Sequence, residues 1–92
     1  MANVVITFRI MPQDPGIDLK QIEDEAKKEI VKFCNSQEFK TSIEPIAFGL
    51  NALNIIFVMD ENKGSTESLE KKINEIKGVQ SVEVIDVRRA IG

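Results

Sequence analysis

The residue types that carry out most protein chemistry are scarce in this chain. It contains no histidine and a single cysteine, Cys34. Catalysis by a nucleophile paired with an imidazole is therefore excluded, and zinc and copper lack their usual ligands. No glycine-rich phosphate-binding loop is present. We therefore expect no catalytic residue, no metal site and no cofactor, and we interpret Cys34 as a small packed side chain.

One run of residues resembles the start of a calcium-binding loop. The run is DENKG, residues 60–64. Gly64 falls at a position that should supply a ligand, and Lys71 stands where the closing glutamate of such a loop would be. We interpret the run as a turn exposed to solvent.

Two features have no obvious chemical explanation. The first is the turn EPIAFGL, residues 44–50, which carries Phe48 and Gly49 where the chain should turn toward solvent. The second is the pair Arg88 and Arg89, the only adjacent arginines. A purely structural interpretation makes Phe48 a hydrophobic plug that folds back, beside a Gly49 with positive φ, and makes the arginines an ordinary charged strand end. The residues alone leave both interpretations open.

The elements that must position these residues follow from the hydrophobic periodicity. Alternation predicts strands over 3–11, 38–47, 50–60 and 79–89. Apolar residues at spacings of three and four predict helices over 18–34, with Asp18 as N-cap and Gln21 completing a capping box, and over 65–78, stopped by Gly78. The order β-α-β-β-α-β predicts a ferredoxin-like α/β plait of the α+β class, with a four-stranded antiparallel sheet and two helices on one face. We expect residues 1–92 to form one domain.

The pattern also predicts the place of individual strands. Pro45 cannot donate to a ladder, so its strand should lie at an edge or end near 44. The strand over 50–60 is apolar on both faces, as in an inner strand. In the last strand Val82 and Val84 point one way but Ile85 and Val87 the other, so either both faces are partly covered or a bulge shifts the phase.

Composition narrows the possible partners. The chain has a net charge of −3 and 42% hydrophobic residues, and no apolar run is long enough to span a bilayer. A net acidic chain is a poor phosphate-backbone binder. An RNA-binding plait also needs aromatic residues on the open face of its sheet, the face that the helices do not cover. The positions expected there are Thr7, Arg9, Asn54 and Ile56, with Phe8 on the helix side. We expect a cytoplasmic protein without membrane or direct nucleic-acid contact.

Several motifs together resemble a known family. They are an opening strand that leads into an MP turn, the segment PIAFGL.ALN from residue 45, GST at the start of the second helix, and GV.S..V.DV from residue 78. With this spacing over the whole chain, the sequence resembles the archaeal elongation factor 1-beta proteins. These are stand-alone relatives of the C-terminal exchange domain of eukaryotic elongation factor 1-beta.

The resemblance implies a function without covalent chemistry. It implies a guanine-nucleotide exchange factor for elongation factor 1-alpha that binds the GDP-bound and nucleotide-free forms, and we expect it to be a monomer when free. Phe48 is then expected to enter a pocket beside the partner's nucleotide site as a half-exposed, ordered ring, with Ile46 and Gly49 in the same contact. The eukaryotic domain uses a C-terminal lysine, which is absent from DVRRAIG. Arg88 or Arg89 is the candidate replacement. The alternatives are a regulatory plait that binds a small ligand and an RNA-binding plait.

Overall fold

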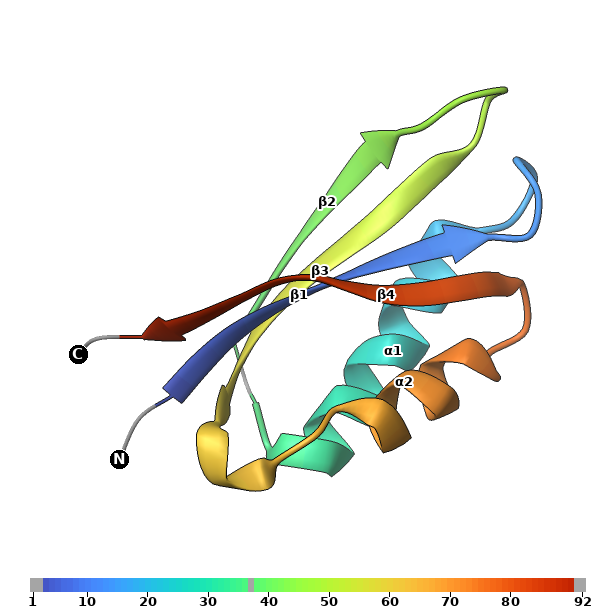
Figure 1. The fold of residues 1–92 in the computed structure, drawn as a ribbon. Coiled ribbons are helices and arrows are strands. Elements are labelled where there is room, and N and C mark those ends of the chain that lie inside the picture. Colours follow the sequence, from blue (N-terminus) through green and yellow to red (C-terminus); the bar gives the residue numbers. More distant parts are fainter. Residues whose placement is uncertain (1–2, 37, 91–92) are drawn as a thin grey trace.

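The computed structural model describes residues 3–36 and 38–90 and has the predicted order of elements. The elements are β1 (Asn3–Pro12), α1 (Leu19–Cys34), β2 (Phe39–Pro45), β3 (Asn51–Asp60), the short 3-10 helix η1 (Glu61–Lys63), α2 (Glu67–Asn74) and β4 (Val79–Ala90). The four strands form one antiparallel sheet in the order β2-β3-β1-β4, and both helices lie on the same face of it (Figure 1). The predicted ferredoxin-like plait is confirmed.

One apolar layer joins the helices to the central strands. Phe8 and Phe57 are fully buried and meet edge to face, with ring centroids 5.1 Å apart. Their helix-side neighbours from both helices and from β1, β3 and β4 complete the layer: Ile6, Ile10, Ile22, Ala26, Ile30, Leu53, Ile55, Met59, Leu69, Ile73 and Val79. The alternation predicted for the first strand is therefore confirmed, because Ile6, Phe8 and Ile10 all face the helices.

The strand predictions are confirmed in place and corrected in length. β2 is an edge strand that ends at Pro45, and β3 lies between β2 and β1. Along the ladder between β1 and β4, Thr7 of β1 pairs with Asp86 of β4, whereas the next residue, Phe8, pairs with Val84. Ile85 is the extra residue of a bulge, which explains the change of phase in the sequence.

The two helices begin near the predicted residues, but the second ends early. Asp18 caps α1 by accepting a hydrogen bond from the backbone N of Lys20 at 3.0 Å. Helix α2 stops at Asn74, four residues before Gly78, so the predicted end is wrong. The chain instead tightens into turns, in which Ile76 N donates to Ile73 O at 3.0 Å and Val79 N donates to Ile76 O at 3.1 Å.

Gly78 serves the turn into β4 rather than the end of α2. Its φ is +95°, and a Cβ added there would lie 2.9 Å from Cγ2 of Ile17. Its carbonyl accepts a hydrogen bond from Gln13 N at 2.8 Å. The β1–α1 loop and the α2–β4 turn are thus packed against each other at one end of the sheet.

We expect Gly78→Ala to lower the free energy of unfolding by about 2 kcal/mol or more, because it adds a contact with Ile17 to the cost of a positive φ. Urea denaturation measures this. Gly64→Ala is the matched control, since Gly64 also has a positive φ, +78°, but nothing lies within 4 Å of an added Cβ. An equal loss in the two variants would contradict the role of the Ile17 contact.

Candidate partner-binding site

The connection between β2 and β3 is a tight turn with an unusual backbone. Leu50 N donates to Ala47 O at 2.9 Å, and Ile46 N donates to Leu50 O at 2.9 Å. Both central residues have positive φ, +54° for Phe48 and +78° for Gly49. Two successive positive φ values are the mark of a type I′ turn, which fits the twist of a hairpin. The sequence indicates this conformation only for Gly49.

Phe48 occupies the more costly of these two positions. A bulky residue with positive φ is an outlier, and such a conformation costs on the order of 1–3 kcal/mol. The side chain of Phe48 does not offset this by burial, since the residue is 96% exposed. The hydrophobic-plug interpretation is therefore wrong. The half-exposed ring expected from the family resemblance is also wrong in degree, because Phe48 is 96% exposed. The turn between β2 and β3 extends beyond the helices (Figure 1).

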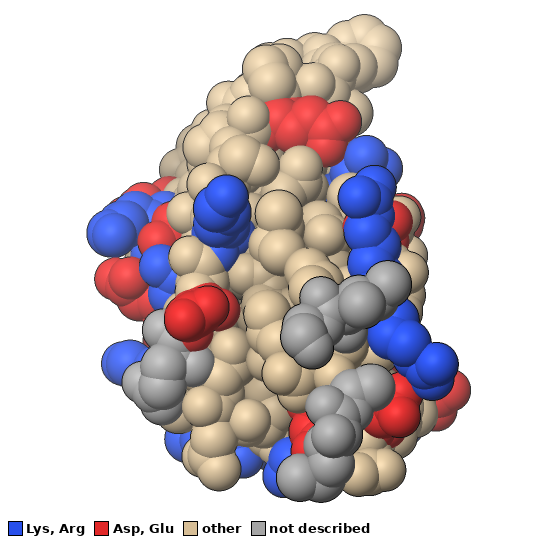
Figure 2. Space-filling model, turned by 90° about the vertical axis from the view of Figure 1, so that its left-hand side faces the viewer, with Lys and Arg blue, Asp and Glu red and all other residues tan. Residues whose placement is uncertain are grey.

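The surroundings of Phe48 form an uncharged tip, which we define as residues 45–50. Ile46 is also exposed at this tip, and an added Cβ at Gly49 would lie 3.9 Å from Cγ of Pro15 in the β1–α1 loop. In Figure 2 the protruding end at the top carries no acidic or basic side chain, whereas both kinds are frequent below it. The tip thus offers apolar surface with the β1–α1 loop beside it.

Arg88 and Arg89 lie at the opposite end of the sheet. Arg89 of β4 pairs with Val4 of β1, and Val4 in turn pairs with Met59 of β3. Met59 is nine residues further along the chain than Leu50, the last residue of the tip. At about 3.4 Å per residue this separates the arginines from the tip by roughly 30 Å. The arginines and Phe48 therefore cannot act on one small pocket.

Each of these arginines has an acidic neighbour and remains largely exposed. Nε of Arg88 lies 2.9 Å from Oδ2 of Asp86, and Nη2 of Arg89 lies 2.8 Å from Oε2 of Glu61. Ion pairs this exposed contribute about 0–1 kcal/mol. Both guanidinium groups can therefore exchange their present partners for another anion at little cost.

The open face of the sheet carries a polar cluster that the sequence does not reveal. Nη2 of Arg9 lies 3.3 Å from Oε1 of Glu44, and Nδ2 of Asn54 donates to the same oxygen at 3.1 Å. The sequence identifies Arg9 and Asn54 only as solvent-side positions, because the register that brings Glu44 to them depends on how far β2 extends. We call this group, Arg9, Glu44 and Asn54, the three-strand cluster.

The comparisons with known proteins agree with one another. A family model described as the EF-1 guanine nucleotide exchange domain matches residues 5–90. The chain belongs to this family. Elongation factor 1-beta of Methanothermobacter thermautotrophicus is 40% identical over 89 residues, covering 97% of this chain and 98% of that protein. Elongation factor 1-beta of Staphylothermus marinus is 38% identical over 90 residues, covering 97% and 98%.

Membership of the exchange-domain family confirms the resemblance stated from the motifs. The solved structures add support for the fold alone. The de novo designed protein Foldit4 superposes with a TM-score of 0.62 at 19% identity, over 98% of each chain. A plait shared with a designed protein shows that the architecture does not determine the function.

The open face of the sheet lacks the aromatic side chains on which an RNA base could stack, among the described residues. Phe8 and Phe57 are buried on the helix side of the sheet, and the cross-strand pairs at the centre of the open face include Thr7 with Ile56 and Arg9 with Asn54. Among residues 3–36 and 38–90, no aromatic side chain lies on this face. The stacking platform of an RNA-binding plait is thus absent from the described sheet.

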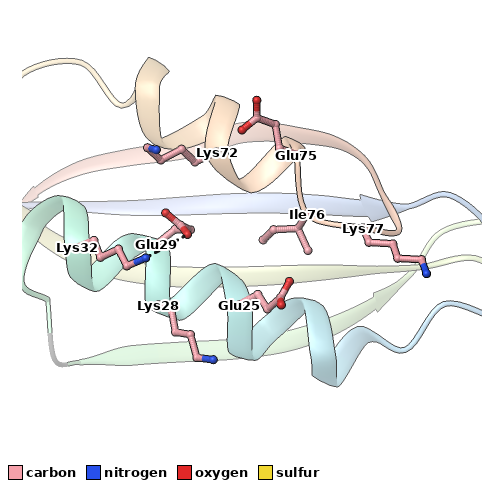
Figure 3. A pocket seen from close by; sticks show the side chains of 8 residues that line it. All are labelled: Glu25, Lys28, Glu29, Lys32, Lys72, Glu75, Ile76 and Lys77. Carbon is pink, nitrogen blue, oxygen red and sulfur yellow. Dashed lines mark ion pairs between the residues drawn. The ribbon is translucent and has the colours of Figure 1, made fainter.

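A groove of about 360 Å³ runs between the two helices (Figure 3). Lysines and glutamates alternate around it, and the only apolar lining residue is Ile76: the lining comprises Glu25, Lys28, Glu29, Lys32, Lys72, Glu75, Ile76 and Lys77. Its charges largely offset one another. The groove does not have the apolar enclosure and few convergent polar groups of a typical small-ligand site.

The part of the chain that the structure describes contains neither a metal cluster nor a membrane-spanning helix. No three or more histidine, cysteine, aspartate or glutamate side chains within it are placed to hold a metal ion. None of its helices is long and apolar enough to cross a membrane.

We expect Phe48→Asn to raise the free energy of unfolding by roughly 0.5–1 kcal/mol, because asparagine adopts positive φ more readily than phenylalanine. Phe48→Ala should leave stability almost unchanged, since the ring is exposed and alanine keeps the backbone cost. Chemical denaturation of both variants checks this. A loss of more than about 1 kcal/mol in Phe48→Ala, a value typical of a lost packing contact, would show that the ring is buried in solution.

Proposed function

We propose that this chain promotes the exchange of GDP for GTP on elongation factor 1-alpha and that Phe48 is its principal contact. The observation that carries the proposal is the fully exposed ring of Phe48, held on a backbone of unfavourable φ in a member of the exchange-domain family. A residue that lowers the stability of the free protein is expected where function requires it.

Exchange of this kind needs differential binding and no covalent step. The factor binds nucleotide-free elongation factor 1-alpha more tightly than the GDP-bound form, and by reciprocity it weakens the binding of GDP by the same factor. A thousandfold weakening corresponds to about 4 kcal/mol. Burial of the Phe48 ring in a pocket that exists only in the nucleotide-free partner would supply about 1.5–3 kcal/mol of this.

The other tip residues complete the contact around Phe48. Ile46 is 43% exposed beside it and adds a smaller apolar area. Gly49 keeps the turn narrow, because it has no side chain and adopts its φ of +78° without strain. We assign to the tip the apolar part of an interface with elongation factor 1-alpha.

The arginine pair forms a second and separate contact in this proposal. Arg88 and Arg89 offer guanidinium groups that bind a carboxylate or a phosphate in bidentate geometry. Because they lie roughly 30 Å from the tip, the partner must extend along the whole sheet to touch both ends. The free protein acts as a monomer, with each sheet end available to the partner.

We expect the wild-type protein to accelerate release of a fluorescent GDP analogue from archaeal elongation factor 1-alpha, measured by stopped flow in excess unlabelled nucleotide. Phe48→Ala should lower the second-order rate constant roughly 10- to 100-fold, the loss that corresponds to an unburied phenyl ring.

A control variant separates this loss from general damage. Lys32→Ala removes an exposed side chain on α1, on the helix side of the sheet, and should leave the rate unchanged. Full activity of a folded Phe48→Ala protein would remove Phe48 from the mechanism. Failure of the wild type to accelerate release would refute the proposed function itself.

A further inference from the structure

The three-strand cluster ties the edge strand β2 to β1 across β3. Arg9 lies on β1, and Asn54 lies opposite it on β3. The β2 residue that pairs with Asn54 is Ser42, and Glu44 lies two residues further along β2, closer to the turn. Nη2 of Arg9 reaches both carboxylate oxygens of Glu44, at 3.3 and 3.4 Å. The side chains of Arg9 and Glu44 are 31% and 40% exposed, so the link is only partly screened by solvent.

The cluster is not arranged for greatest stability. Nε of Arg9 and Oδ1 of Asn54 are both inaccessible to solvent, and neither has a hydrogen-bond partner among the described residues. A buried polar atom without a partner destabilises a fold, and a partly exposed ion pair contributes little in compensation. Polar groups that are kept despite such a loss of stability are expected near functional sites.

The cluster lies at the base of the turn that carries Phe48. Glu44 pairs with Ala52, and Pro45 pairs with Asn51 in the last pair of the ladder. The beginning of β2 is held by α1, where Nζ of Lys27 lies 5.7 Å from the ring centroid of Phe39.

The far end of β2 has no such helix support. Ile43, on the helix side near that end, is 52% exposed although its partner Leu53 is fully buried. The ion pair to Arg9 is the one side-chain ion pair or hydrogen bond that joins β2 to β1 among the described residues.

We propose that Arg9, Glu44 and Asn54 are positioning residues that hold the tip, residues 45–50, in the orientation in which Phe48 meets its partner. This inference rests on the proposed function. A hairpin end fixed before binding loses less conformational freedom when it binds, so it binds faster or more tightly. Without the link, β2 and β3 would bend as a two-stranded ribbon, and the ring would sample several directions.

The test is the exchange assay on Arg9→Met, with and without Phe48→Ala. Met keeps most of the apolar stem of Arg9 and removes the charge. We expect Arg9→Met alone to lower the second-order rate constant roughly 3- to 10-fold, the effect of freeing a segment that must be ordered on binding. In the Phe48→Ala background it should cause no further loss, because there is no ring left to position. Lys32→Met is the matched control, since it breaks the ion pair between Lys32 and Glu29 on α1.

Backbone ¹⁵N relaxation distinguishes positioning from loss of structure, and it should show larger motion at residues 46–50 in Arg9→Met than in the wild type. Glu44→Gln, which keeps the shape of the side chain, repeats the exchange assay and the relaxation measurement if Arg9→Met is poorly folded.

Equal losses from Arg9→Met with and without Phe48 would overturn the inference, as would unchanged motion of the tip. An active wild type with a fully active, folded Arg9→Met protein would refute the positioning role and leave the proposed function intact.

Discussion

The apolar layer between the two helices and the central strands is the contact on which the rest of the molecule depends. Phe8 and Phe57 meet within it, and apolar residues from α1, α2, β1 and β3 surround them. A layer of this kind stabilises only what it covers, since hydrophobic stabilisation is proportional to the area removed from water. The helices cover the middle of the sheet, and β2 and β3 extend past them (Figure 1). The end of that hairpin must therefore be held by backbone hydrogen bonds and by polar side chains.

The extended hairpin of β2 and β3 ends in an exposed apolar side chain rather than in a pocket. Phe48 is exposed and has positive φ, both of which are unfavourable in the free protein. Under the proposed function, burial of the ring in the partner offsets this loss of stability. The polar cluster of Arg9, Glu44 and Asn54 has the same character, because two of its atoms lack partners within the described chain. Both features are what the proposed function requires of a tip that binds a partner, while the core lies between the helices and the central strands.

The architecture could be predicted well from the sequence, since each element carries its own periodicity. The apolar alternation of residues 3–11 and the stripe of α1 indicate the faces that meet in the core. Features that depend on pairing between distant segments are harder to predict. The exact end of α2 is set by turns that dock Gly78 against Ile17. The φ of Phe48 follows from the tight turn between β2 and β3, and the contact of Glu44 with Arg9 follows from the register of three strands. The wide separation of Phe48 from the arginines already follows from the predicted topology, because β3 and β4 both run antiparallel to β1.

The most direct test of the central claim is an NMR titration of the ¹⁵N-labelled protein with unlabelled, nucleotide-free elongation factor 1-alpha. If the tip is the principal contact, the amides of residues 46–50 should shift or broaden first and most strongly, and those at the end of β4 around Arg88 should follow. The amides around the groove between α1 and α2 should change little. Strong changes at that groove with unaffected amides at Phe48 and Gly49 would contradict the role of the tip as the principal contact.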